Sequence, residues 1–248
     1  MTFIDVLLLS LLAGGATGIG GLIVLFKKPG KNLIGLLMGF SGGVMLALSI
    51  FELIPESIKE GGVEFSIMAF LAGAVFIFIV DMLLPHIRFG IEEKGVSWRI
   101  FKVGLLVAIG IAIHNIPEGF VVGAGYQYAP QFGLLIAMAI AMHNIPEGIA
   151  TALPLRVGGA SKTKAFSIAL LSGLVEPIGA ILAFAFLSGF PYLIPASLAF
   201  AAGVMIFITI DELIPVACEY GKKQHVVALG IFLGIVMVLL SLYIHTAQ

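Results

Sequence analysis

Apolar residues run through the chain in long blocks, and short polar connections separate the blocks. A helix needs about 20 apolar residues to cross the hydrocarbon core of a bilayer. The pattern predicts eight membrane-spanning helices, at about residues 3–26, 33–57, 65–87, 102–125, 132–155, 165–188, 193–217 and 226–244. The longest polar connection covers only residues 88–102, so we expect residues 1–248 to form a single transmembrane domain.

Composition supports a membrane protein and excludes several other classes. Hydrophobic residues make up 60% of the 248 residues and charged residues 11%, whereas a soluble domain carries about a quarter charged residues. The net charge of −1 gives no electrostatic basis for nucleic-acid binding. The single cysteine, Cys218, excludes an internal disulfide and a thiolate metal cluster. The expected fold is therefore all-α and polytopic, surrounded by the lipid bilayer.

The basic residues predict the orientation of the chain, because Lys and Arg are retained on the cytoplasmic side of a membrane. Lys59 lies in the connection after span two. The other Lys and Arg residues all lie in or beside the connections after spans one, three, five and seven. Both termini should therefore lie outside the cytoplasm, in a multi-pass protein of the plasma or inner membrane.

Two internal repeats relate spans that cross the membrane in opposite directions. GLLVAIGIAIHNIPEGF (104–120) resembles GLLIAMAIAMHNIPEGI (133–149), which matches span four to span five. FSGGVMLALSIFELIPES (40–57) resembles FAAGVMIFITIDELIPVA (200–217), which matches span two to span seven. Inverted repeats of this kind are common in transporters, whose binding sites lie near the bilayer midplane between the repeats.

The repeated HNIPEG motif places ionisable side chains within hydrocarbon, where they are costly. Positions i and i+4 share one helix face, so the histidine and glutamate of each copy point the same way, with the asparagine beside them. The proline removes a backbone donor and kinks the helix. The residues are His114, Asn115 and Glu118 in the first copy and His143, Asn144 and Glu147 in the second.

This set of donors suits a divalent transition metal, because imidazole favours metals such as Zn and carboxylate extends the range towards Mn. A carboxylate on each helix could also bridge two adjacent metal ions. The alternative role is hydrogen bonding between helices. Such bonds contribute about 0.6 kcal/mol on average, which is too little to offset two buried glutamates.

Further polar residues extend this pattern along the predicted path through the membrane. Glu176 precedes a proline in span six, where it is either a metal ligand or a carboxylate paired elsewhere. Spans two and seven carry matched polar stripes, Met45, Ser49, Glu52 and Glu56 in the first and Met205, Thr209, Asp211 and Glu212 in the second. The topology predicts a partly solvated outer mouth at the acidic residues of span two and an inner mouth at those of span seven. Ordinary interfacial charges near helix ends are the alternative.

These residues together resemble the ZIP (Zrt/Irt-like) family of divalent metal transporters. The resemblance rests on eight spans, outward termini, H-N-x-P-E-G in spans four and five, E-P in span six and E-L-I-P in spans two and seven. It implies a 3+2+3 helix bundle with a binuclear metal site between spans four and five. The implied ligands are His114, Asn115, Glu118, His143, Asn144, Glu147 and Glu176, with Met45 as a candidate additional ligand.

The expected function is uptake of divalent transition metal ions, with Zn²⁺ foremost and Fe²⁺, Mn²⁺, Co²⁺ and Cd²⁺ as further substrates. The inward direction follows from the resemblance. We expect no prosthetic group. We also expect no activity as an intramembrane metalloenzyme, because the zincin signature H-E-x-x-H is missing. A divalent cation channel with acidic mouths is the alternative function, and a homodimer is a candidate assembly.

Overall fold

The computed structural model describes residues 3–26, 30–83, 96–221 and 224–246. Within these ranges nearly every residue is helical and none is in a strand. Eight helical segments of the described chain are long and apolar enough to cross a membrane. The predicted all-α polytopic fold is therefore confirmed. The end of predicted span three, residues 84–87, lies outside the described residues, as does most of the connection that follows it.

Five of the predicted spans are single helices, and three are assembled from shorter pieces. The single helices are α1 (Phe3–Phe26), α4 (Val63–Leu83), α5 (Val96–Tyr128), α6 (Pro130–Val157) and α11 (Gln224–Thr246). Span two comprises α2 (Lys31–Leu48), the π-helix η1 (Ser49–Leu53) and α3 (Ile54–Gly61), and span six comprises α7 (Lys162–Gly173) and α8 (Glu176–Gly189). Span seven comprises the 3₁₀-helix η2 (Pro191–Leu193), α9 (Ile194–Ile208), the π-helix η3 (Thr209–Leu213) and α10 (Ile214–Tyr220).

The two π-helices fall at matched positions of the long-range repeat. In each, the residue before the proline of E-L-I-P donates its backbone N–H five residues back, from Ile54 to Ser49 and from Ile214 to Thr209. Pro55 and Pro215 follow directly. A proline ring clashes with the carbonyl four residues earlier, and the wider π turn relieves that clash. The sequence repeat therefore corresponds to a repeat of local structure.

Span six breaks between its two helices at residues 174–175. Pro177 lacks the N–H that would bond the carbonyl of Gly173, and Leu174 leaves helical geometry with ψ of 5°. Glu176 is then the first residue of α8. The irregular backbone therefore lies just before Glu176, at residues 174–175, and not at the glutamate itself.

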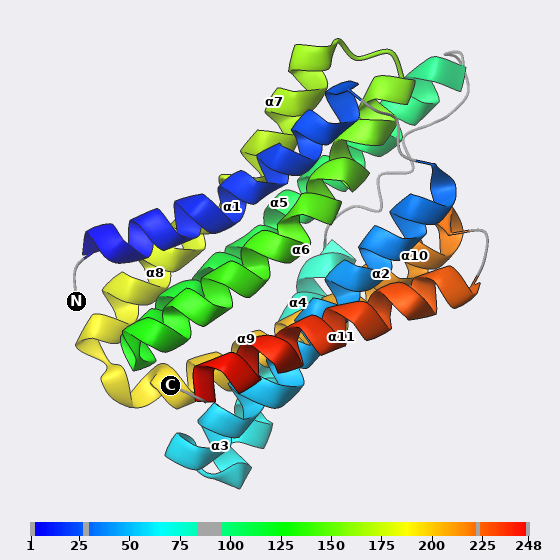
Figure 1. Ribbon diagram of the computed structural model, residues 1–248. Coiled ribbons are helices and arrows are strands. Elements are labelled where there is room, and N and C mark those ends of the chain that lie inside the picture. Colours follow the sequence, from blue (N-terminus) through cyan, green and yellow to red (C-terminus); the bar gives the residue numbers. More distant parts are fainter. Residues whose placement is uncertain (1–2, 27–29, 84–95, 222–223, 247–248) are drawn as a thin grey trace.

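The helices pack as two groups, which Figure 1 shows on either side of a diagonal. In one group α1, α5, α6, α7 and α8 pack on one another, and in the other α2, α3, α4, α9, α10 and α11 do so. The main contacts between the groups are those of α2 with α6 and of α5 with α9. The HNIPEG helices thus belong to one group and the E-L-I-P helices to the other, while the 3+2+3 arrangement stays a prediction.

Close helix approach within the first group depends on the glycine of each HNIPEG motif. A Cβ atom at Gly148 would collide with the backbone of Thr17 in α1. One at Gly119 would collide with the backbone of Glu176 in α8. Small residues let backbones meet in membranes, where packing rather than the hydrophobic effect associates helices. These two contacts bring α1 and α8 against the motif helices.

Candidate metal centre

The two copies of the motif meet at the carboxylate of Glu118. Its Oε1 atom lies 3.0 Å from Nε2 of His114 on the same helix and 3.1 Å from Nε2 of His143 on α6. Glu147 completes the cluster from α6, with its Oε1 atom 3.9 Å from Nε2 of His114. In the first copy, His114 and Glu118 lie on one helix face, as the i, i+4 spacing predicts. The packing of α6 against α5 brings His143 of the second copy to the same carboxylate.

The cluster is buried and holds several polar atoms without hydrogen-bond partners. His114 is 4% exposed, and the other three side chains are fully buried. Both carboxylate oxygens of Glu147, Oε2 of Glu118 and Nδ1 of His143 have no hydrogen-bond partner. Buried polar groups are normally satisfied, and these atoms are available as ligands for an ion. One ligand atom from each of His114, Glu118 and Glu147 lies within 4.8 Å of the others, which is close enough to share a metal ion.

The two asparagines are held by backbone carbonyls of neighbouring helices. Asn115 donates its amide N–H to the carbonyl of Ser172 on α7, at 2.9 Å. Asn144 donates to the carbonyl of Ala13 on α1, also at 2.9 Å. Because the amide nitrogens are engaged in this way, the amide oxygens are left as acceptors, and both are buried without a partner.

Glu176 joins the cluster through Asn144 and not through Asn115. The Asn144 amide donates a second hydrogen bond to Oε1 of Glu176, while Oε2 of that carboxylate is buried and unpartnered. The two copies of the motif are therefore inequivalent: the second copy orients a third carboxylate. Together the site offers imidazole nitrogens, carboxylate oxygens and amide oxygens, a donor set suited to a divalent transition metal.

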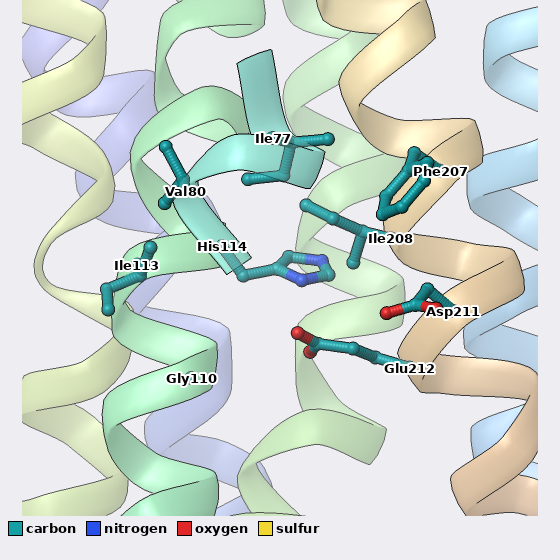
Figure 2. A pocket seen from close by; sticks show the side chains of 9 residues that line it. All are labelled: Ile77, Val80, Gly110, Ile113, His114, Phe207, Ile208, Asp211 and Glu212. Atoms are coloured by element: carbon teal, nitrogen blue, oxygen red, sulfur yellow. The ribbon is translucent and has the colours of Figure 1, made fainter. Parts of the chain in front are cut away.

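A cavity of about 450 Å³ reaches the cluster from one end of the helix bundle. Its lining combines His114 and Glu147 with acidic residues of span seven, Asp211, Glu212 and Glu219. A second pocket, of about 20 Å³, lies beside it. Figure 2 shows the imidazole of His114 and the carboxylates of Asp211 and Glu212 directed towards that pocket. Asp211 and Glu212, which the sequence places at an inner mouth, thus line the same cavity as two residues of the cluster, while their role as a mouth stays a prediction.

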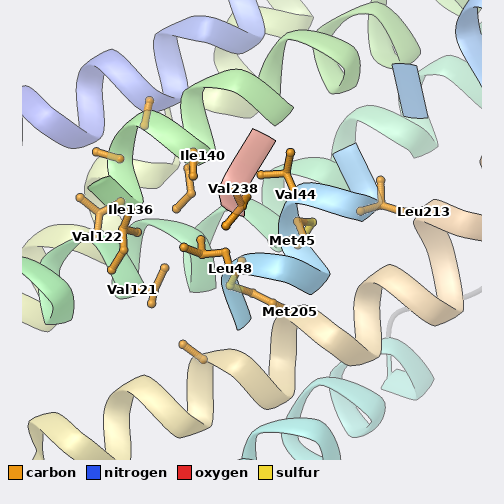
Figure 3. Close-up of a cluster of buried hydrophobic side chains, with 14 of the residues drawn as sticks. Val44, Met45, Leu48, Val121, Val122, Ile136, Ile140, Met205, Leu213 and Val238 are labelled. Atoms are coloured by element: carbon orange, nitrogen blue, oxygen red, sulfur yellow. The ribbon is translucent and has the colours of Figure 1, made fainter. Parts of the chain in front are cut away.

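Beyond Glu118 along α5, away from the cavity-lining Val107 and Gly110, apolar side chains of the hydrophobic core pack between the helices. They include Val121 and Val122 from α5, Leu48 from α2 and Met205 from α9, all fully buried (Figure 3). Met45 belongs to this hydrophobic core as well, with its sulfur 3.7 Å from the hydroxyl of Thr209. Its role as a metal ligand stays a prediction.

The acidic stripe of span two differs from the predicted outer mouth. Glu52 is only 6% exposed, and its Oε1 atom is buried without a partner. The expectation that Glu52 is partly solvated is therefore wrong, because η1 directs this side chain into the protein rather than towards water. Glu56 is the solvated member of the stripe, and Ser49 is fully buried.

Several groups around the site are not apparent from the sequence. The carbonyls of Ala13 and Ser172 carry no side-chain signal, so nothing in the pattern could have identified them. The hydroxyl of Ser41 on α2 donates to the carbonyl of His143 at 3.3 Å, which joins the two helix groups beside the cluster. Glu219 could have been found, because it lies two helical turns beyond Glu212.

Comparison with known proteins supports the same interpretation. A sequence profile of a family described as "ZIP Zinc transporter" matches residues 91–242. The chain is 41% identical over 251 residues to the zinc transporter ZupT of Corynebacterium aurimucosum, an alignment that covers 94% of each chain. It is 42% identical to the zinc transporter ZupT of Chlorobium phaeovibrioides, over 95% of this chain and 96% of that protein. It is 37% identical to the protein of the same name from Streptococcus mutans, over 95% of each.

Proposed function

Because this chain belongs to the ZIP zinc transporter family, we propose that it carries divalent transition metal ions across a membrane, with Zn²⁺ as the main substrate and Fe²⁺, Mn²⁺, Co²⁺ and Cd²⁺ as further substrates. The observation that carries the proposal is the buried His–Glu cluster, whose unpartnered atoms face one another within membrane-spanning helices. Buried carboxylates need a compensating charge, and a dication supplies it.

The site would hold two metal ions, with Glu118 and Glu147 as shared ligands. Two features support this proposal. Glu118 contacts both imidazoles at one end of the cluster, and Glu176 contributes a further carboxylate through Asn144. Metal content measured on purified protein at saturating zinc should then exceed one ion per chain. A ratio that stays at one would leave a mononuclear site.

A carrier accounts for the arrangement better than a continuous channel. The cavity reaches the cluster from one end of the bundle, and fully buried apolar side chains such as Val121, Val122 and Leu48 pack beyond the cluster. Asp211, Glu212 and Glu219 line the open side, next to the connection that holds Lys222 and Lys223. Since basic connections lie on the cytoplasmic side, the cavity would face the cytoplasm, where it would release ions taken up from outside.

The proposed orientation has both termini outside the cytoplasm. A single cysteine replacing Thr2 or Gln248, in a Cys218→Ser background, should react with an impermeant maleimide added to intact cells. If the cysteine reacts only after the cells are lysed, the termini lie in the cytoplasm. The cavity would then open to the outer side rather than to the cytoplasm.

Metal flux into proteoliposomes that contain only this protein tests the transport function. Zn²⁺ uptake should saturate with concentration, and Glu147→Gln should abolish it while the protein still inserts, because a dication in a low-dielectric site then loses an anionic ligand. Repeating the assay with the other metals ranks the substrates. Repeating it with an imposed pH gradient shows whether metal transport is coupled to proton transport. Absence of uptake for every metal would overturn the proposal, and unitary conductance steps would favour the channel.

A further inference from the structure

One polar network connects the two helix groups at the end of the bundle away from the cavity. The hydroxyl of Tyr128, the last residue of α5, donates to Oε2 of Glu56 on α3 at 2.5 Å. Lys59 contacts the same Oε2 atom at 3.1 Å and the Tyr128 hydroxyl at 3.3 Å. Oε1 of Glu60 lies 3.3 Å from that hydroxyl. The phenol hydroxyl thus contacts three charged side chains of one short helix.

This contact crosses between the groups, unlike that of a neighbouring tyrosine on the same helix. Tyr128 belongs to α5 in the first group, and its partners belong to α3 in the second. The hydroxyl of Tyr126 instead donates to Asp5 of α1 at 2.9 Å, within the first group. The Tyr128 ring also packs edge-on against Phe132 of α6, with centroids 5.4 Å apart, which fixes its direction.

The network lies on the side of the candidate site away from the cavity. Tyr128 is ten residues beyond Glu118 along α5, a separation of about 15 Å at 1.5 Å per residue. The cavity lies in the other direction along α5, where Val107 and Gly110 line it. The apolar residues Val121 and Val122 lie between the cluster and the network. Separating the two groups at this end would expose those residues.

We propose that Tyr128, Glu56, Lys59 and Glu60 form a latch that holds this end of the bundle closed, so that the latch must break before a metal ion can reach the cluster from the outer side. The inference rests on the proposed transport function for its purpose, but the latch itself is a property of the two helix groups. The Glu56 side chain is 25% exposed. Its bond to Tyr128 is therefore less screened by water than a fully exposed ion pair, which contributes little.

Thiol accessibility measures the opening that the latch would control. A cysteine replaces Val121 in a Cys218→Ser background, and the full-length protein in nanodiscs is treated with a water-soluble thiosulfonate, which can reach both faces. The labelling rate then reports the fraction of molecules that are open on the latch side. Tyr128→Phe should raise this rate about tenfold. A factor of ten corresponds to about 1.4 kcal/mol, the lower end of the range for a hydrogen bond to a charged group.

Matched variants separate the latch from a general loosening of the protein. Tyr126→Phe removes the same hydroxyl two residues away and should leave the rate unchanged, because its bond stays within one group. Glu56→Ala removes the acceptor of both Tyr128 and Lys59 and should raise the rate at least as much as Tyr128→Phe. A cysteine at Ala150, which lines the cavity, should label rapidly with or without the latch.

Equal rates for Tyr128→Phe, Tyr126→Phe and the parent protein would overturn the proposal. An equal rise in both tyrosine variants would also overturn it, because the effect would then be structural rather than specific to the contact between groups. The labelling needs neither zinc nor transport. Failure of the latch and failure of the proposed transport function are therefore separate results.

Discussion

The inequivalence of the two asparagines gives the sharpest test of how the candidate metal centre is built. Each is changed to alanine, Asn144→Ala in one protein and Asn115→Ala in the other. Both changes remove an amide oxygen from the cluster and a hydrogen bond of 2.9 Å to a backbone carbonyl. Only Asn144→Ala also removes the donor to Oε1 of Glu176. The difference between the two variants therefore isolates the orientation of that carboxylate.

The expected difference in zinc affinity between the two variants follows from the hydrogen bond between Asn144 and Glu176, which Asn115 does not make. A hydrogen bond to a charged group contributes about 1.5–3 kcal/mol, and each 1.4 kcal/mol is a factor of about ten in affinity. Groups that orient metal ligands affect metal affinity by about ten- to hundredfold in other proteins. Zinc should therefore bind about ten- to hundredfold more weakly to the Asn144→Ala protein than to the Asn115→Ala protein.

The measurement is the zinc dissociation constant of purified protein, obtained by competition with a chelator. Both variants are then repeated in a Glu176→Ala background, which removes the carboxylate that Asn144 orients. Residues that act through each other are not additive, so the difference between the asparagine variants should disappear there. If the two variants bind zinc equally well in the parent background, Asn144 does not position Glu176 and the reasoning is wrong.

Three further changes test other parts of the structure. His143→Ala removes a nitrogen donor and leaves oxygen ligands, so Zn²⁺ flux should fall more than Mn²⁺ flux; equal losses would argue against a role in selectivity. Gly148→Ala places a methyl group against the backbone of Thr17 and should destabilise the detergent-solubilised protein by about 1–3 kcal/mol or more. In the control Gly15→Ala, the methyl group points into open space and should not destabilise the protein. Equal shifts in melting temperature for the two variants would show that the contact with Thr17 is unimportant. Glu52→Gln should reduce uptake equally at low and high ionic strength, because a buried charge is weakly screened by salt. If the effect disappears at high salt, Glu52 is solvated and acts as part of an outer mouth.

The sequence by itself determined the all-α fold and the number of spans, and it singled out the histidines and glutamates that the structure brings together. Span length follows from bilayer thickness, so the apolar blocks were sufficient to count helices. The i, i+4 spacing of His114 and Glu118 was sufficient to place them on one face, because that relation is internal to a helix. The repeat of E-L-I-P also anticipated that spans two and seven would share a local structure, although not that it would be a π-helix.

Tertiary structure decided which groups meet across helices. In a membrane, helices are apolar on every side, so the periodicity that identifies the packed face of a soluble helix is lost. The sequence therefore could not show that His143 would contact Glu118 of the other motif, or that Asn144 rather than Asn115 would orient Glu176. The burial of Glu52 was equally hidden. Each depends on how one helix is rotated against another, and that rotation is decided by the packing of whole helices, to which the local motifs contribute only the close contacts and the π turns.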